Sequence, residues 1–198
     1  MTLALLALLM VLAAGALAPE MNQLRHFLWL RGYLDWLGAR LATLGLWNSE
    51  FGLALILLPL LAATALLSAV LGSHLHGLLH FGFALVMLFW CWGPRDLDAD
   101  ARRAATAENA EQRQQALIAL GGNTGDAPVR SGQLVDAVFS SGLSRWFAPA
   151  FWFIAFGPTG VLGYRLTQLL AQSSDLQSRL PAPQVQAAAH LHAALAWL

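Results

Sequence analysis

Uninterrupted apolar stretches constrain this chain more than any other feature of its sequence. Residues 51–72 (FGLALILLPLLAATALLSAVLG) contain no charged side chain, and a second stretch, residues 75–92 (LHGLLHFGFALVMLFWCW), follows almost directly. A helix needs about 20 apolar residues to cross the hydrocarbon core of a bilayer, which is about 30 Å thick. The two stretches therefore predict a helical hairpin that crosses a membrane and returns.

Two further hydrophobic stretches flank this hairpin. Residues 2–18 (TLALLALLMVLAAGALA) lack the basic residues that open a cleavable signal peptide, so we expect a retained membrane anchor. Residues 146–170 are also hydrophobic, but the pair Gly157-Pro158 interrupts them. Such a segment either crosses the membrane with a break or is re-entrant, entering and leaving on the same side. The sequence leaves both alternatives open.

The composition agrees with a membrane protein and excludes several classes of site. Charged residues make up 11% of the chain, whereas a soluble domain carries about 25%. The net charge is zero, which gives no reason to expect nucleic-acid binding. All eleven basic residues are arginine, so a Walker-type phosphate loop and a lysine Schiff base are both excluded. The single cysteine, Cys91, excludes an intramolecular disulfide.

The arginines predict an orientation, because cytoplasmic loops of membrane proteins carry an excess of basic residues. The segments after the first and third stretches are rich in arginine: Arg25, Arg31 and Arg40 in one, and Arg95, Arg102, Arg103, Arg113, Arg130 and Arg145 in the other. We therefore expect a multi-pass membrane protein with the N-terminus outside and both segments cytoplasmic. Arg179 agrees with this orientation if residues 146–170 are re-entrant.

The segment 22–44 predicts an amphipathic helix. Its apolar residues recur at spacings of three and four: Phe27, Leu30, Leu34, Leu37, Leu41 and Leu44. Arg31 and Asp35 lie one turn apart on the other side. This helix either lies in the membrane interface, which we favour, or packs on the membrane helices.

The long segment 94–145 predicts a small helical cytoplasmic subdomain. Asp96, Asp98 and Asp100 crowd its start, where the helix dipole favours negative charge and where magnesium binding is the alternative role. The chain ends on residues 184–198, a helical run without a stop signal, which predicts that the full protein is longer. The expected fold is all-α: a polytopic membrane helical bundle with an interfacial amphipathic helix and this subdomain.

Few residues point to chemistry. His74, His76 and His80 cluster at the tip of the hairpin, and His76 and His80 have the spacing of metal ligands on a helix; interfacial polar residues are the alternative interpretation. Arg165 lies inside the fourth hydrophobic stretch, where a charge is a candidate functional group or snorkels to the interface. The common hydrolase signatures HExxH and GxSxG do not occur.

Residues 147–170 (FAPAFWFIAFGPTGVLGYRLTQLL) resemble the AmpE family in the run FAPAFW, the Gly-Pro break and the following GYR. The opening MTL and the order of anchor, amphipathic segment, hairpin, long loop and broken helix are also similar. AmpE is an inner-membrane protein encoded beside the AmpD amidase and linked to β-lactamase induction. The resemblance implies a regulatory or accessory protein of this kind in a bacterial inner membrane.

The same segment resembles the CobD/CbiB family, membrane enzymes that join an aminopropanol to a corrinoid carboxylate in an ATP-driven reaction of cobalamin biosynthesis. Their pattern ESVAENLSDGVVAPLFW places a Glu-Asn pair where this chain has Ser140 and Ser141, and an aspartate at Ser144. Gln168 and Ala171 replace a later asparagine and aspartate. Because a ligase of this type needs carboxylates for magnesium, we expect a scaffold that has lost this chemistry.

The resemblances together imply binding rather than catalysis. The expected ligand is a peptidoglycan-recycling intermediate, a nucleotide with magnesium, or a protein partner from the AmpD-linked pathway; a homo-oligomer is a further expectation. The matched positions imply a site lined by Asp136, Ser140, Ser144, Arg145, Tyr164, Arg165 and Gln168. The alternatives are a divergent CobD/CbiB-type ligase and a transporter-like bundle, which a broken helix with a charge also favours.

Overall fold

The structure is a computed structural model that describes residues 6–11, 13, 27–43, 45–72, 77–92, 102–103, 105–107, 109–120 and 131–197. Throughout these ranges the regular structure is helical and no strand occurs, which confirms the all-α prediction. The chain divides into two compact units. The first unit combines Met1–Trp92 with Ala148–Leu198, and the second unit is Gly93–Phe147.

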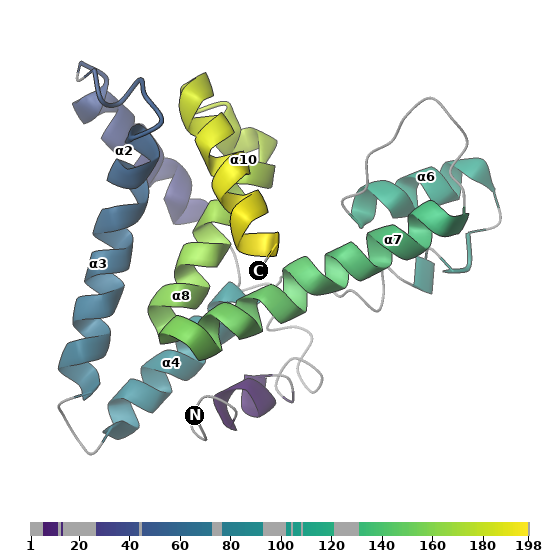
Figure 1. Ribbon diagram of the computed structural model, residues 1–198, viewed down its shortest axis with the longest axis horizontal. Helices are drawn as coiled ribbons and strands as arrows, with labels where there is room; N and C mark the ends of the chain where they lie inside the picture. The colour runs from purple at the N-terminus through teal and green to yellow at the C-terminus, as the bar shows by residue number, and fades with distance from the viewer. Residues whose placement is uncertain are drawn as a thin grey trace. The chain divides into compact units, whose positions relative to one another are not determined.

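The first unit contains most of the hydrophobic helices (Figure 1). Residues 6–11 are helical, and the rest of the predicted anchor, apart from residue 13, lies outside the described residues. The other helices of the unit are α2 (Leu28–Leu41), α3 (Gly52–Gly72), α4 (Leu78–Cys91), α8 (Ala148–Gln172), α9 (Ser174–Gln177) and α10 (Ala182–Trp197).

Two helical segments of the described chain are long and apolar enough to cross a membrane: α3, with 21 residues, and the run Gly132–Gln172, which includes α8. The helix α4 is apolar but shorter, with 14 residues. The predicted stretch 51–72 is thus confirmed as one helix and the stretch 75–92 as a helix from Leu78 onward. These helices indicate membrane association, while the full multi-pass arrangement stays a prediction.

A bend at Gly157 divides α8 into a first arm, residues 148–156, and a second arm, residues 158–172. Gly157 has φ 63° and ψ −147°, a conformation that side chains other than glycine rarely adopt. Pro158 follows directly and removes one backbone donor from the helix. In Figure 1 the chain turns at this bend, and the second arm runs beside α3 and α10.

The helix α2 packs its leucine stripe on protein, the second of the two alternatives for the amphipathic segment. Leu30, Leu34 and Leu37 are buried, whereas Trp36 remains exposed on the surface. The polar side of α2 is joined to α9 and the turn after it by ion pairs. Arg31 and Asp35 supply these contacts, so α9 lies against α2.

The start of α10 is fixed against the start of α3. Gln184 is fully buried, and its Nε2 donates a hydrogen bond to the backbone carbonyl of Trp47. Gly52 makes this approach possible, because a Cβ atom there would lie 2.1 Å from Gln184 Nε2 and 2.7 Å from Trp47 O. From this contact with α3, α10 runs along the second arm of α8.

In its described residues the second unit is helical. It contains α6 (Ala110–Ala119), α7 (Ser131–Gly142) and the π-helical turn η3 (Leu143–Phe147). The apolar contacts between the helices come from Ala116, Leu117, Leu120, Leu134 and Ala137. Asp96, Asp98 and Asp100 lie outside the described residues.

Candidate functional site

Arg165 is a buried charge on the second arm of α8. Its side chain is 7% exposed, and its Nη1 donates a 2.6 Å hydrogen bond to Gln168 Oε1. A spacing of three residues places both side chains on one face of the helix. The guanidinium carbon also lies 6.0 Å from the ring centre of Phe27, within the range of a cation–π contact. Protein therefore surrounds this charge, which does not support a snorkelling arginine.

Aromatic side chains form one wall beside Arg165. Phe27 stacks on Trp90 with ring centres 5.1 Å apart and an interplanar angle of 11°. Trp29 lies 6.3 Å from each of these rings. This aromatic wall, defined as Phe27, Trp29 and Trp90, joins the start of α2 to the end of α4. Phe27 covers the guanidinium on this side, and electrostatic interactions strengthen when water is excluded.

Tyr164 faces α10. It is 1% exposed, and its ring centre lies 5.6 Å from that of His192. His192 Nε2 lies 3.0 Å from Gln172 Nε2, so the histidine joins α10 to the end of α8.

The remaining predicted site residues belong to the second unit. Asp136 and Ser140 are exposed on α7. Ser140 Oγ donates to Ala137 O and Ser144 Oγ donates to Ser141 O, both at 3.2 Å, in the local pattern common for helical serines. Arg145 lies in η3.

The structure thus brings together Tyr164, Arg165 and Gln168 on one helical arm. The residues Asp136, Ser140, Ser144 and Arg145 are described within the second unit alone. A single cavity lined by both groups stays a prediction. Ser141 has a structural contact within the second unit: its buried hydroxyl donates a 2.6 Å hydrogen bond to Leu120 O.

The histidines at the hairpin tip are only partly described. His80 Nδ1 lies 3.1 Å from Ser68 O and 3.3 Å from Ser68 Oγ, so this ring joins α4 to α3. His74 and His76 lie outside the described residues. In the part of the chain that the structure describes, no three His, Cys, Asp or Glu side chains come together as a metal site.

Two ion pairs between α2 and the segment of α9 were not predicted from the sequence. Arg31 Nε lies 2.8 Å from Asp175 Oδ2, and Arg179 Nη1 lies 2.5 Å from Asp35 Oδ2. Each of the two segments, α2 and α9 with the turn after it, offers one basic and one acidic residue four positions apart, in opposite order. The spacing of these charged residues is visible in the sequence, but it does not predict which distant residues they contact.

Comparison with known proteins leaves the family open. No protein-family model, curated protein or solved structure matches this chain. The resemblance to AmpE and to the CobD/CbiB enzymes therefore stays a prediction from the residues quoted above.

Proposed function

We propose that this chain is a multi-pass inner-membrane protein in which α8 is re-entrant rather than crossing. The N-terminus lies outside, and the segments that precede α3 and follow α4 lie in the cytoplasm. The support is the pairing of α2 with α9. If α8 crossed the bilayer, Asp35 and Arg179 would lie on opposite sides, yet they are in contact. A re-entrant α8 returns Arg179 to the arginine-rich side.

Within this arrangement, the protein acts as an AmpE-like accessory or regulatory protein, linked to β-lactamase induction and peptidoglycan recycling. It works by binding an anionic ligand near Arg165. The observation that carries this proposal is the buried charge itself: an ionisable group inside a hydrophobic segment is costly and marks a functional site by default. The geometry of a guanidinium matches that of a carboxylate or a phosphate group. Muropeptides and nucleotides carry such groups.

Calorimetry on the purified full chain tests the binding proposal, with a muropeptide in one titration and ATP with magnesium in another. We expect saturable heat with one of the two ligands and a Kd at least about tenfold weaker in Arg165→Gln, which corresponds to about 1.4 kcal/mol. The matched control is Arg40→Gln, because Arg40 is exposed and packs over Trp36. No heat with either ligand, or equal loss in both variants, contradicts the proposal.

A cellular assay tests the link to β-lactamase. A strain without the gene should show altered β-lactamase induction, and wild-type protein but not Arg165→Gln should restore it. Restoration of cobalamin synthesis, with normal β-lactamase induction throughout, would instead favour the divergent ligase.

A further inference from the structure

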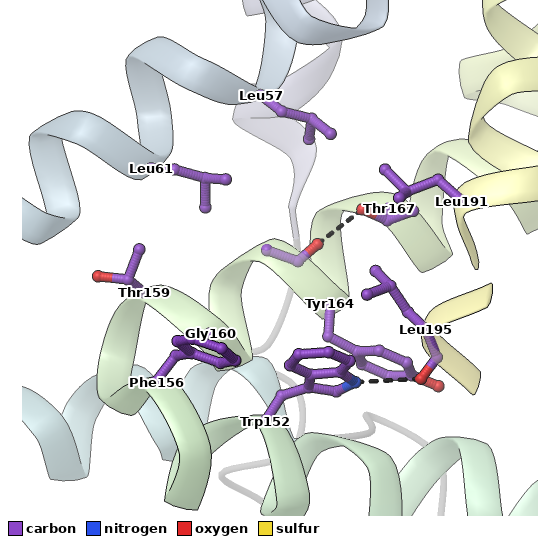
Figure 2. Close-up of a pocket in the computed structure, with 11 residues that line it drawn as sticks. Leu57, Leu61, Trp152, Phe156, Thr159, Gly160, Tyr164, Thr167, Leu191 and Leu195 are labelled. Carbon is purple, nitrogen blue, oxygen red and sulfur yellow. Dashed lines mark hydrogen bonds between the residues drawn. The ribbon is translucent and has the colours of Figure 1, made fainter. Parts of the chain in front are cut away.

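A cavity lies where α8 bends. Its volume is about 260 Å³, and it is lined by residues of α3, α10 and both arms of α8 (Figure 2). Large apolar side chains supply most of its wall: Leu57 and Leu61 from α3, Trp152 and Phe156 from the first arm, and Leu191 and Leu195 from α10. The bend at Gly157 creates the space, because it turns the two arms around a common volume.

Two of the polar groups in the wall are engaged in internal contacts. Trp152 Nε1 donates a 3.1 Å hydrogen bond to Leu195 O, and Thr167 Oγ1 donates a 2.8 Å bond to Gly163 O (Figure 2). A ligand that depends on hydrogen bonds finds little here. Cavities with apolar linings stay dry and accept hydrocarbons.

The position of the cavity along α3 matches the interior of a bilayer. Leu61 lies roughly 14 Å from the start of this helix, at about 1.5 Å per residue, which is near the middle of its 21 residues. Phe156 is 66% exposed and Leu191 is 37% exposed, so the cavity opens toward the surroundings of the helices. In the proposed membrane arrangement these surroundings are hydrocarbon at this depth.

We propose that this cavity binds one acyl chain of a bilayer phospholipid. The inference rests on the membrane placement proposed above, but not on the ligand of Arg165. Pockets for drug-sized ligands measure about 300–1,000 Å³, so the available volume suits a segment of a single chain and not a bulky ring system. The lipid headgroup remains outside, which makes binding insensitive to headgroup type.

Photolabelling tests this proposal on the full chain in nanodiscs that contain a phospholipid with a diazirine in its acyl chain. Peptide mass spectrometry should find label at the cavity wall on α10. Leu61→Trp and Leu191→Trp, which fill the cavity from two helices, should both abolish this label. Leu61→Ala, which enlarges the cavity, should keep it. The matched control Leu66→Trp changes α3 at a side chain that is 68% exposed, and should leave the label intact.

The results separate the alternatives. Label that persists in both filling variants, or that is equal at the cavity and at exposed positions such as Leu66, contradicts a chain-binding site. Competition by excess polyprenyl phosphate but not by unlabelled phospholipid also contradicts it, and assigns the cavity to a lipid carrier. Carbonate extraction of the same membranes tests placement independently: a protein released into solution refutes the membrane arrangement, whatever the cavity binds.

Discussion

Asp35 and Arg179 are in contact although they lie 144 positions apart in the sequence. Arg179 Nη1 is 2.6 Å from Asp35 Oδ1 and 2.5 Å from Oδ2, so one guanidinium nitrogen contacts both carboxylate oxygens. Arg31 and Asp175 form the reciprocal pair one turn away on each segment. Together the two pairs place α9, which follows the broken helix α8, against the amphipathic helix α2.

Charge reversal at this contact should loosen α9 from α2. In Asp35→Arg, the new arginine faces Arg179 and also lies one turn from Arg31, so we expect a lower Tm and faster proteolysis near Ser178. The double variant Asp35→Arg with Arg179→Asp should recover most of the loss, because opposite charges face each other again. Differential scanning fluorimetry in detergent measures the effect at low and high salt. A double variant no more stable than the single one would contradict the pairing.

Gly157→Ala should destabilise the bend. Its φ of 63° with ψ −147° is nearly restricted to glycine, and strain of this kind costs about 1–3 kcal/mol. Gly82→Ala is the matched control, since Gly82 is exposed inside α4 with open space around it and alanine favours helix by up to about 1 kcal/mol. Thermal unfolding should therefore move in opposite directions in the two variants. A neutral Gly157→Ala would mean that the helix does not bend as described.

Gly52→Ala should disrupt the junction of α3 and α10. The added Cβ meets Gln184 Nε2 and the Trp47 carbonyl oxygen, and the backbone atom cannot move aside as a flexible side chain can. Overpacking of this kind costs about 1–3 kcal/mol or more. Gly72→Ala, at the other end of α3 and in open space, should be tolerated. Equal Tm values for the two variants would contradict the close contact.

Local patterns predicted the helices well, and tertiary relationships poorly. The uncharged run 51–72 is sufficient to specify α3, and the run 184–198 corresponds to α10. The Gly157-Pro158 pair predicted a break in the helix. No local sequence signal predicts whether the chain then crosses the membrane or returns to the side from which it entered. The same holds for Asp35 and Arg179, whose pairing depends on how the helices meet.

In the candidate site, too, features within one helix were predicted and contacts between helices were not. Arg165 was identified because a charge is unusual inside a hydrophobic segment, and Gln168 was predicted from the resemblance to the CobD/CbiB family. Their mutual hydrogen bond agrees with the helical spacing. The aromatic wall of Phe27, Trp29 and Trp90 could not be predicted, because it joins side chains from separate helices. The apolar cavity escaped prediction for the same reason: its lining comes from three helices that meet only in the folded unit.

The most direct test of the re-entrant arrangement is labelling with a membrane-impermeant maleimide in intact spheroplasts and inside-out vesicles. The background variant is Cys91→Ser, which removes the single cysteine from its buried position. Single cysteines then replace exposed residues: Ala39 in α2 and Ser178 after α9. We predict that both react only in inside-out vesicles. Labelling of Ser178→Cys in intact spheroplasts, with Ala39→Cys protected, would show that α8 crosses the membrane and would contradict the account.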